Sequence, residues 1–153
     1  MIHIVGHTAI DHISRVSSLP ARNGSSTITR RTVRFGGGAA NIATGIARLG
    51  GEGTLVSAVG GDFAGGEYDA WLKENGVGTD FYTVPEEHTA TAFMFTDPSG
   101  NQITFFEWGA SGIFSSADPP ALPFVHMATA DPLFHMKVEE NAGIASFDPG
   151  HDL

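Results

Sequence analysis

Three consecutive glycines, residues 36–38, separate a stretch of alternating polarity from a stretch with helical periodicity. Over residues 25–35, Thr, Ile and Val alternate with Arg and Ser, which is typical of strands with one face in water. Apolar residues then recur at i, i+4 and i+7 before Gly50, which predicts a helix over about 39–49. The glycines let backbone amides approach a ligand at the positive end of that helix. The segment therefore predicts either a ligand-binding turn or a plain strand-to-helix connection.

Short apolar runs and helical patterns alternate along the rest of the chain. Strands are expected at 2–5, 54–59, 91–96, 102–106, 124–128 and 144–147, and helices at about 62–76 and 133–141. We expect Asp62 to cap the first of these helices, and Asp131 either to cap the second or to lie near a phosphate and its magnesium ion. Two hairpin-like inserts on this frame predict an α/β fold, with a mostly parallel sheet and a separate β flap.

The composition of the chain narrows the classes of protein to which it can belong. A chain of 153 residues that is 41% hydrophobic is expected to form one globular domain and no disordered tail. Its net charge of −9, with no basic stretch longer than Arg30-Arg31, argues against a nucleic-acid partner. It has no cysteine, and no apolar run approaches the roughly 18 residues of a membrane span. We therefore expect a cytoplasmic protein without a membrane partner.

Two polar residues are candidates for ligand binding. Asp11 follows the first apolar run, and open α/β sheets bind ligands beyond the carboxyl ends of their strands; the alternative is a turn or capping residue. Asn41, near the start of the predicted helix, offers a donor and an acceptor to a hydroxylated ligand. His3 and His7 would share a face of a strand, but no accompanying ligand spacing indicates a metal site.

The segment from Gly36 to Ala43, with Gly50 and Gly60 at the expected intervals, resembles the N-terminal signature of the ribokinase family, also called the PfkB carbohydrate kinases. The resemblance covers nearly the whole chain, and residues 68–72, 101–103 and 146–150 are most similar to prokaryotic adenosine and nucleoside kinases. It implies a ribokinase-like α/β/α sandwich with a β-sheet lid, incomplete at the C-terminus. It also implies transfer of the γ-phosphoryl group of ATP, with magnesium, to a primary hydroxyl.

The resemblance assigns roles to five residues. Asp11 and Asn41 would bind ribose hydroxyls, and the backbone of Gly37 and Gly38 would lie close to the sugar. Gly38 stands where ribokinases proper commonly carry Lys, which argues against free ribose. Phe106 matches the aromatic lid position that stacks on a base; the alternative is that the lid phenylalanines form only the lid's own apolar face. The partner implied is a small nucleoside or sugar, with a homodimer formed through the lid.

The sequence departs from the family in its catalytic part. The family's catalytic base lies in a C-terminal Gly-Ala-Gly-Asp segment, which this sequence lacks, so no catalytic residue is assigned. Residues 1–153 are expected to be the N-terminal portion of one ribokinase-like domain, with lid strands inserted at about 13–35 and 81–107, and to be inactive alone. Three functions remain open: part of a nucleoside kinase, part of a ribokinase- or fructokinase-type sugar kinase, and a truncated non-catalytic protein that binds a ligand or a partner.

Overall fold

Short apolar runs that end near glycine or a polar residue form a five-stranded parallel sheet in the computed structural model, which describes residues 1–150. Its strands lie in the order β5-β4-β1-β8-β9, and all four neighbouring pairs are parallel. Their bounds are β1 Ile2–Val5, β4 Gly53–Gly60, β5 Gly78–Val84, β8 Phe124–Met127 and β9 Ile144–Phe147. The central position of β1 places the residues that follow Val5 at the carboxyl edge of the sheet.

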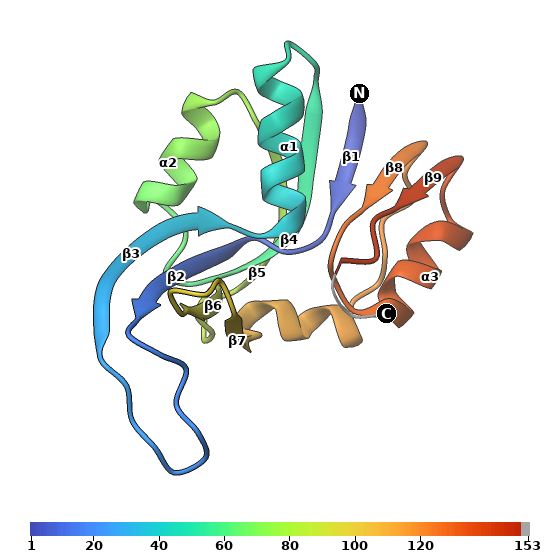
Figure 1. The fold of residues 1–153 in the computed structure, drawn as a ribbon. Coiled ribbons are helices and arrows are strands. Elements are labelled where there is room, and N and C mark those ends of the chain that lie inside the picture. Colours follow the sequence, from blue (N-terminus) through green and yellow to red (C-terminus); the bar gives the residue numbers. More distant parts are fainter. Residues whose placement is uncertain (151–153) are drawn as a thin grey trace.

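A second sheet, here called the lid sheet, extends from that carboxyl edge (Figure 1). Its strands are β2 Ala9–Val16, β3 Ile28–Gly36, β6 Ala90–Thr96 and β7 Gln102–Glu107, in the order β3-β2-β6-β7. The pairs β2–β3 and β6–β7 are antiparallel hairpins, whereas β2 and β6 are parallel. The parallel sheet and the separate lid sheet agree with the fold class that the sequence predicts.

Helices cover both faces of the parallel sheet, because its buried side chains alternate between the faces. The helical elements are α1 Gly38–Arg48, α2 Glu67–Glu74, α3 Pro132–Glu140 and the 3-10 helix η1 Gly109–Ser115. On one face, Ile4, Leu55 and Leu72 belong to a core with the alanines of α1. On the other, Val5, Val56, Phe114 and Phe134 form a second core with η1 and α3. None of the helices formed by residues 1–150 is both long and apolar enough to span a bilayer.

The two predicted caps have different outcomes. The prediction that Asp62 caps a helix is wrong, because α2 begins only at Glu67, with Gly66 at its N-cap. Asp62 instead accepts hydrogen bonds from the backbone N–H and the hydroxyl of Thr89, both at 2.8 Å. Asp131 does cap α3, by accepting a hydrogen bond from the backbone N–H of Phe134 at 3.0 Å.

The boundaries of the lid sheet differ from the expected 13–35 and 81–107. The first lid strand already begins at Ala9, so Asp11 lies inside β2 and not at the end of β1. Residues 81–84 belong to β5, which pairs with β4 in the parallel sheet. Both differences arise because the chain crosses from one sheet to the other through very short connections.

Candidate functional site

Each glycine of residues 36–38 stands where a Cβ atom would meet a close neighbour. A Cβ atom on Gly36 would collide with the carboxylate of Asp11, and one on Gly37 with the carbonyl oxygen of His7. Gly37 also has a φ of 95°, a conformation that other residues rarely adopt. A Cβ atom on Gly38 would lie 2.9 Å from Oγ1 of Thr129, in the loop after β8. This turn therefore holds β2, β3 and α1 against the carboxyl edge of the parallel sheet.

Asp11 presents a partly buried carboxylate beside this turn. Burial raises its pKa, and the neighbouring His12 opposes that rise. The hydroxyl of Tyr68 donates a hydrogen bond to the carbonyl oxygen of Gly36 at 2.6 Å. Burial, together with the charge of Asp11, raises the pKa of Tyr68, so this phenol stays protonated at neutral pH. The tyrosine thus fixes the strand end against which the carboxylate packs.

Strand register places Asp11 and Phe106 on the same face of the lid sheet. Asp11 is the partner of Ala92 in β6, and Ala92 is the partner of Phe106 in β7. Residues paired in this way lie side by side on one face, and two strand spacings amount to about 10 Å. The carboxylate and the aromatic ring therefore stand in one row across the sheet.

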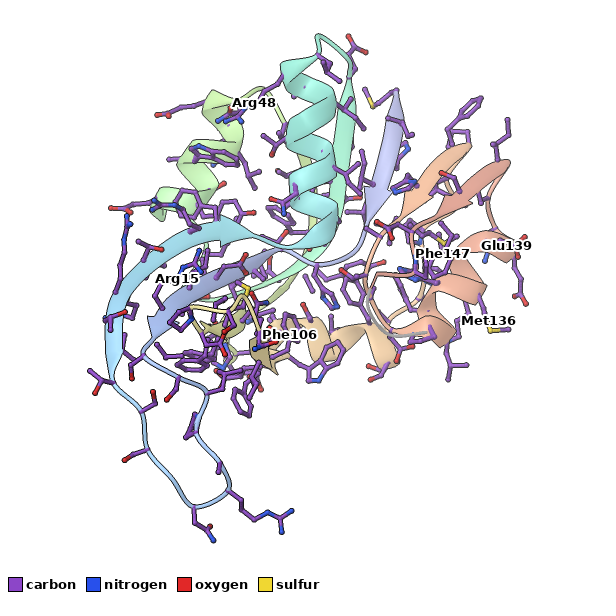
Figure 2. All side chains as sticks on the ribbon, viewed as in Figure 1. Arg15, Arg48, Phe106, Met136, Glu139 and Phe147 are labelled. Atoms are coloured by element: carbon purple, nitrogen blue, oxygen red, sulfur yellow. The ribbon has the colours of Figure 1, made fainter. Side chains whose placement is uncertain are left out.

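A groove with a volume of about 1050 Å³ lies below that face. Gln102, Thr104 and Phe106 line it from β7, while Thr129, His135, Met136, Glu139 and Phe147 line it from the region of β8, α3 and β9. Figure 2 shows Met136 and Glu139 on α3 and Phe147 on β9, across from Phe106. The groove therefore separates the lid sheet from the C-terminal part of the parallel sheet.

His7 lies where the groove meets the glycine turn. Its backbone N–H donates to Thr129 at 2.9 Å, and its carbonyl oxygen accepts from the N–H of Ala40. Burial, with a smaller effect from His135, lowers its pKa to about 4, so the ring is neutral at pH 7. The sequence indicates His7 only as a candidate metal ligand, although a residue close after a central strand is also placed for ligand binding.

Phe106 is the predicted site residue that lines the groove, and Asn41 lies apart from it. Asn41 lies in the first turn of α1 with an exposed side chain, and its backbone N–H donates to the carbonyl oxygen of Gly37 at 3.0 Å. Its side chain forms no hydrogen bond with any other residue in the range 1–150. Asp11 and Phe106, in contrast, share a row of the lid sheet. Gly37 and Gly38 contact the groove-lining residues His7 and Thr129.

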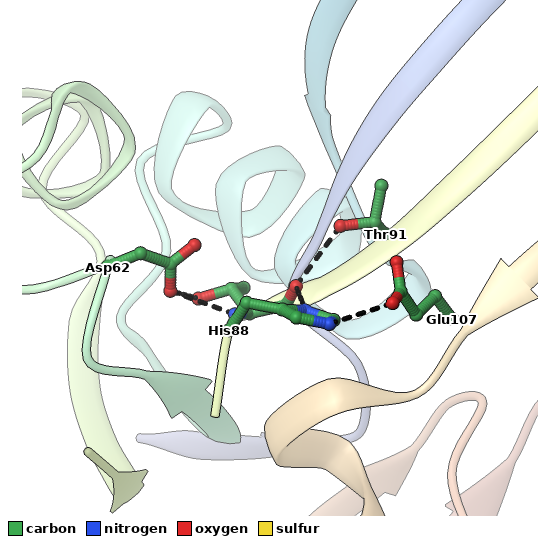
Figure 3. Close-up of polar contacts among 5 residues, drawn as sticks. Asp62, His88, Thr91 and Glu107 are labelled. Carbon is green, nitrogen blue, oxygen red and sulfur yellow. Dashed lines mark hydrogen bonds and ion pairs between the residues drawn. The ribbon is translucent and has the colours of Figure 1, made fainter. Parts of the chain in front are cut away.

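A polar cluster joins the two sheets beside the site (Figure 3). The ring of His88 contacts Glu107 through Nε2 at 3.0 Å and the carbonyl oxygen of Thr89 through Nδ1 at 2.9 Å. Because both partners are hydrogen-bond acceptors, a doubly protonated ring satisfies the two contacts, and they raise the pKa of His88. Asp62 and Thr91 also bond to Thr89. The connection from β5 to β6 is thereby fixed to the end of β7.

The acidic and histidine side chains of the described residues are dispersed. Within residues 1–150 there is no group of three or more His, Asp or Glu side chains placed to hold a metal ion. His3 bonds to the carbonyl oxygen of Phe124 at 3.3 Å and His7 to Ser111 at 3.1 Å, so the two histidines have separate partners. Asp131 is already used as the cap of α3.

Known proteins resemble this chain over nearly its whole length. The family model described as pfkB family carbohydrate kinase matches residues 1–131. A nucleoside kinase from Methanothermobacter thermautotrophicus is 45% identical over an alignment of 159 positions, which covers 97% of this chain and 52% of that protein. The crystal structure of a nucleoside kinase from Methanocaldococcus jannaschii, an archaeal member of the ribokinase family, has a TM-score of 0.90 at 41% identity and covers 99% of this chain and 52% of its own.

A nucleoside kinase from Burkholderia thailandensis, solved in complex with inosine, has a TM-score of 0.81 at 26% identity. The match covers 99% of this chain and 52% of that one. The chain thus spans about half the length of the relatives that it matches.

Proposed function

Because this chain belongs to the pfkB family of carbohydrate kinases, we propose that it forms the acceptor-binding portion of an ATP-dependent kinase that phosphorylates a primary hydroxyl of a nucleoside. One observation carries the proposal: Asp11 packs against the glycine turn and shares a row of the lid sheet with Phe106. A ligand with a hydroxylated ring at one end and a flat aromatic ring at the other matches this row. The similarity to three nucleoside kinases favours the same ligand class.

The sugar end of the ligand is proposed to lie at the glycine turn. The carboxylate of Asp11 accepts hydrogen bonds from ribose hydroxyls, and bonds to a charged group contribute about 1.5–3 kcal/mol each. The turn of Gly37 and Gly38 allows a sugar ring to approach the backbone and the N-terminus of α1 closely, because no side chain intervenes. Asn41 is proposed to bind a further hydroxyl from the first turn of α1, where its side chain is exposed and has no described hydrogen-bond partner.

The base end is proposed to stack on the lid. Phe106 is 37% exposed and lines the groove, so part of its ring is available to a ligand. Stacking of a base on an aromatic side chain contributes about 1–3 kcal/mol. A free sugar has no flat ring to use this surface, which favours a nucleoside over ribose or fructose.

The family implies ATP as the phosphoryl donor, together with magnesium. ATP would supply the γ-phosphoryl group, and the family's catalytic base would come from the Gly-Ala-Gly-Asp segment, which is not in this sequence. Phosphoryl transfer is therefore proposed for a protein that carries that segment together with this acceptor site. The residues described here bind and orient the acceptor.

Calorimetric titration with adenosine, inosine, ribose and fructose tests the proposal. We expect the nucleosides to bind more tightly than either sugar, and Asp11→Ala to abolish binding. Asp80→Ala is the matched control, because Asp80 is exposed on β5 and should leave the affinity unchanged. Binding of the free sugars alone would favour a sugar kinase, and unchanged affinity in Asp11→Ala would refute the placement of the site.

We propose that the chain forms a homodimer through the face of the lid sheet opposite to Asp11. Val33, Ile103 and Phe105 lie on the face away from Asp11 and are 46%, 41% and 61% exposed. Exposed apolar side chains gathered on one sheet face are typical of a surface that pairs with another protein. A second copy of the same face would cover them symmetrically.

A further inference from the structure

The environment of His7 assigns a specific hydrogen-bonding role to its ring. Nδ1 lies 3.1 Å from the hydroxyl oxygen of Ser111, and both side chains are buried. The ring centroid is 5.2 Å from that of Phe106 in β7 and 5.4 Å from that of Trp108, which follows β7; both residues line the groove. Phe114 packs on the ring at 6.0 Å. The imidazole is thus held in one position beside the surface on which a base is proposed to stack.

The protonation of the ring follows from its partners. Most buried hydroxyls donate a hydrogen bond, and within residues 1–150 the only partner of the Ser111 hydroxyl is Nδ1 of His7, so we assign the hydroxyl as the donor. Because burial and the charge of a protonated His135 both oppose protonation of His7, its pKa is low and the ring is neutral. A neutral imidazole whose Nδ1 accepts a hydrogen bond carries its proton on Nε2. Nε2 forms no hydrogen bond with the residues of that range.

We propose that His7 is a specificity-determining residue, whose Nε2–H donates a hydrogen bond to an acceptor atom of the nucleobase while Phe106 and Trp108 pack against the base. This assignment rests on the proposed nucleoside site, and it adds a preference among nucleobases. Ser111 fixes the donor state, so the site prefers a base with a ring nitrogen or a carbonyl oxygen at that point. A base with a C–H or N–H group there would leave the imidazole donor unpaired, which costs affinity.

Matched ligands test the assignment on the chain itself. Inosine has three acceptors on its base, and each is missing from one analogue: purine riboside lacks O6, while 3-deazainosine and 7-deazainosine replace N3 and N7 by C–H. We expect one of the three analogues to bind about two- to tenfold more weakly than inosine, as the loss of one hydrogen bond predicts. If all three bind as tightly as inosine, the assignment is refuted. Failure of inosine itself to bind would refute the nucleoside site as well.

Three substitutions locate the donor. His7→Asn keeps a polar atom near the position of Nδ1 and removes Nε2, so the discrimination between inosine and the weak analogue should disappear while the affinity for ribose is unchanged. His7→Gln places an amide N–H near the position of Nε2 and should restore part of the discrimination. Ser111→Ala keeps His7 and frees its tautomer, so it should weaken the discrimination even if neither His7 variant folds. Full discrimination in His7→Asn, or in Ser111→Ala where the His7 variants do not fold, would overturn the proposal.

Discussion

Lowering the pH should destabilise this protein through His7 in a way that can be calculated. The pKa of His7 is about 4 in the folded protein, against an ordinary value of 6.5 in an unfolded chain. Between these values the unfolded chain binds more protons, so the folded state loses stability as the pH falls below about 6.5, and the loss is complete near pH 4. At 1.36 kcal/mol per pKa unit the full effect is about 3 kcal/mol, and about 2 kcal/mol of it falls between pH 7 and pH 5.

Urea unfolding at pH 7 and pH 5 measures this effect when the wild type is compared with His7→Asn. The variant has no group that titrates at this position, so changes from other groups, including His135, appear in both proteins and cancel in the comparison. We expect the free energy of unfolding of the wild type to fall by about 2 kcal/mol more than that of the variant between the two pH values. An equal fall in both proteins would show that His7 is not buried as a neutral ring.

Two further predictions concern the glycine turn and the lid. Gly37→Ala should lower the free energy of unfolding by about 1–3 kcal/mol, because the residue has a φ of 95° and its Cβ atom would collide with the carbonyl oxygen of His7. Gly45→Ala is the matched control in α1, where a Cβ atom meets open space, and it should stabilise the protein by about 1 kcal/mol in the same thermal unfolding assay; similar effects of the two would refute the packing argument. Phe105→Ser should shift a lid dimer toward the monomer in analytical ultracentrifugation, whereas Thr104→Ala, on the groove face, should leave the mass unchanged; a monomeric wild type would refute the dimer.

Sequence patterns predicted the structure correctly where the interactions that form it lie within one element or turn. The spacing of apolar residues over 39–49 predicted α1 within one residue at each end, because one face of that helix covers the parallel sheet. The strands expected at 91–96 and 102–106 are joined by a local turn, in which Asp97 accepts hydrogen bonds from the backbone of Ser99 and Asn101. In both cases the decisive interactions connect residues that are close in the sequence.

Long-range contacts decided what the sequence patterns could not. Asp62 has the sequence context of a helix cap, but its hydrogen-bond partner is Thr89. The helix α2 and the strand β5 lie between the two residues in the sequence. Asp11 was expected at the end of β1, whereas its position in β2 becomes clear only through the pairing of β2 with β6. The bond between His7 and Ser111 joins residues more than 100 positions apart, and neither has a local pattern that indicates it.

The parallel pairing of β2 with β6 also determines when the lid can form during synthesis. Ala9 pairs with Ala90, and α1, β4, α2 and β5 lie between them in the chain. Closing so long a loop costs entropy, which is offset only once the intervening elements have packed. During synthesis the hairpin of β2 and β3 therefore emerges early. The edge of β2 that pairs with β6 stays unpaired until β6 has been made. The acceptor site is completed only after β1, β4 and β5 of the parallel sheet have been made.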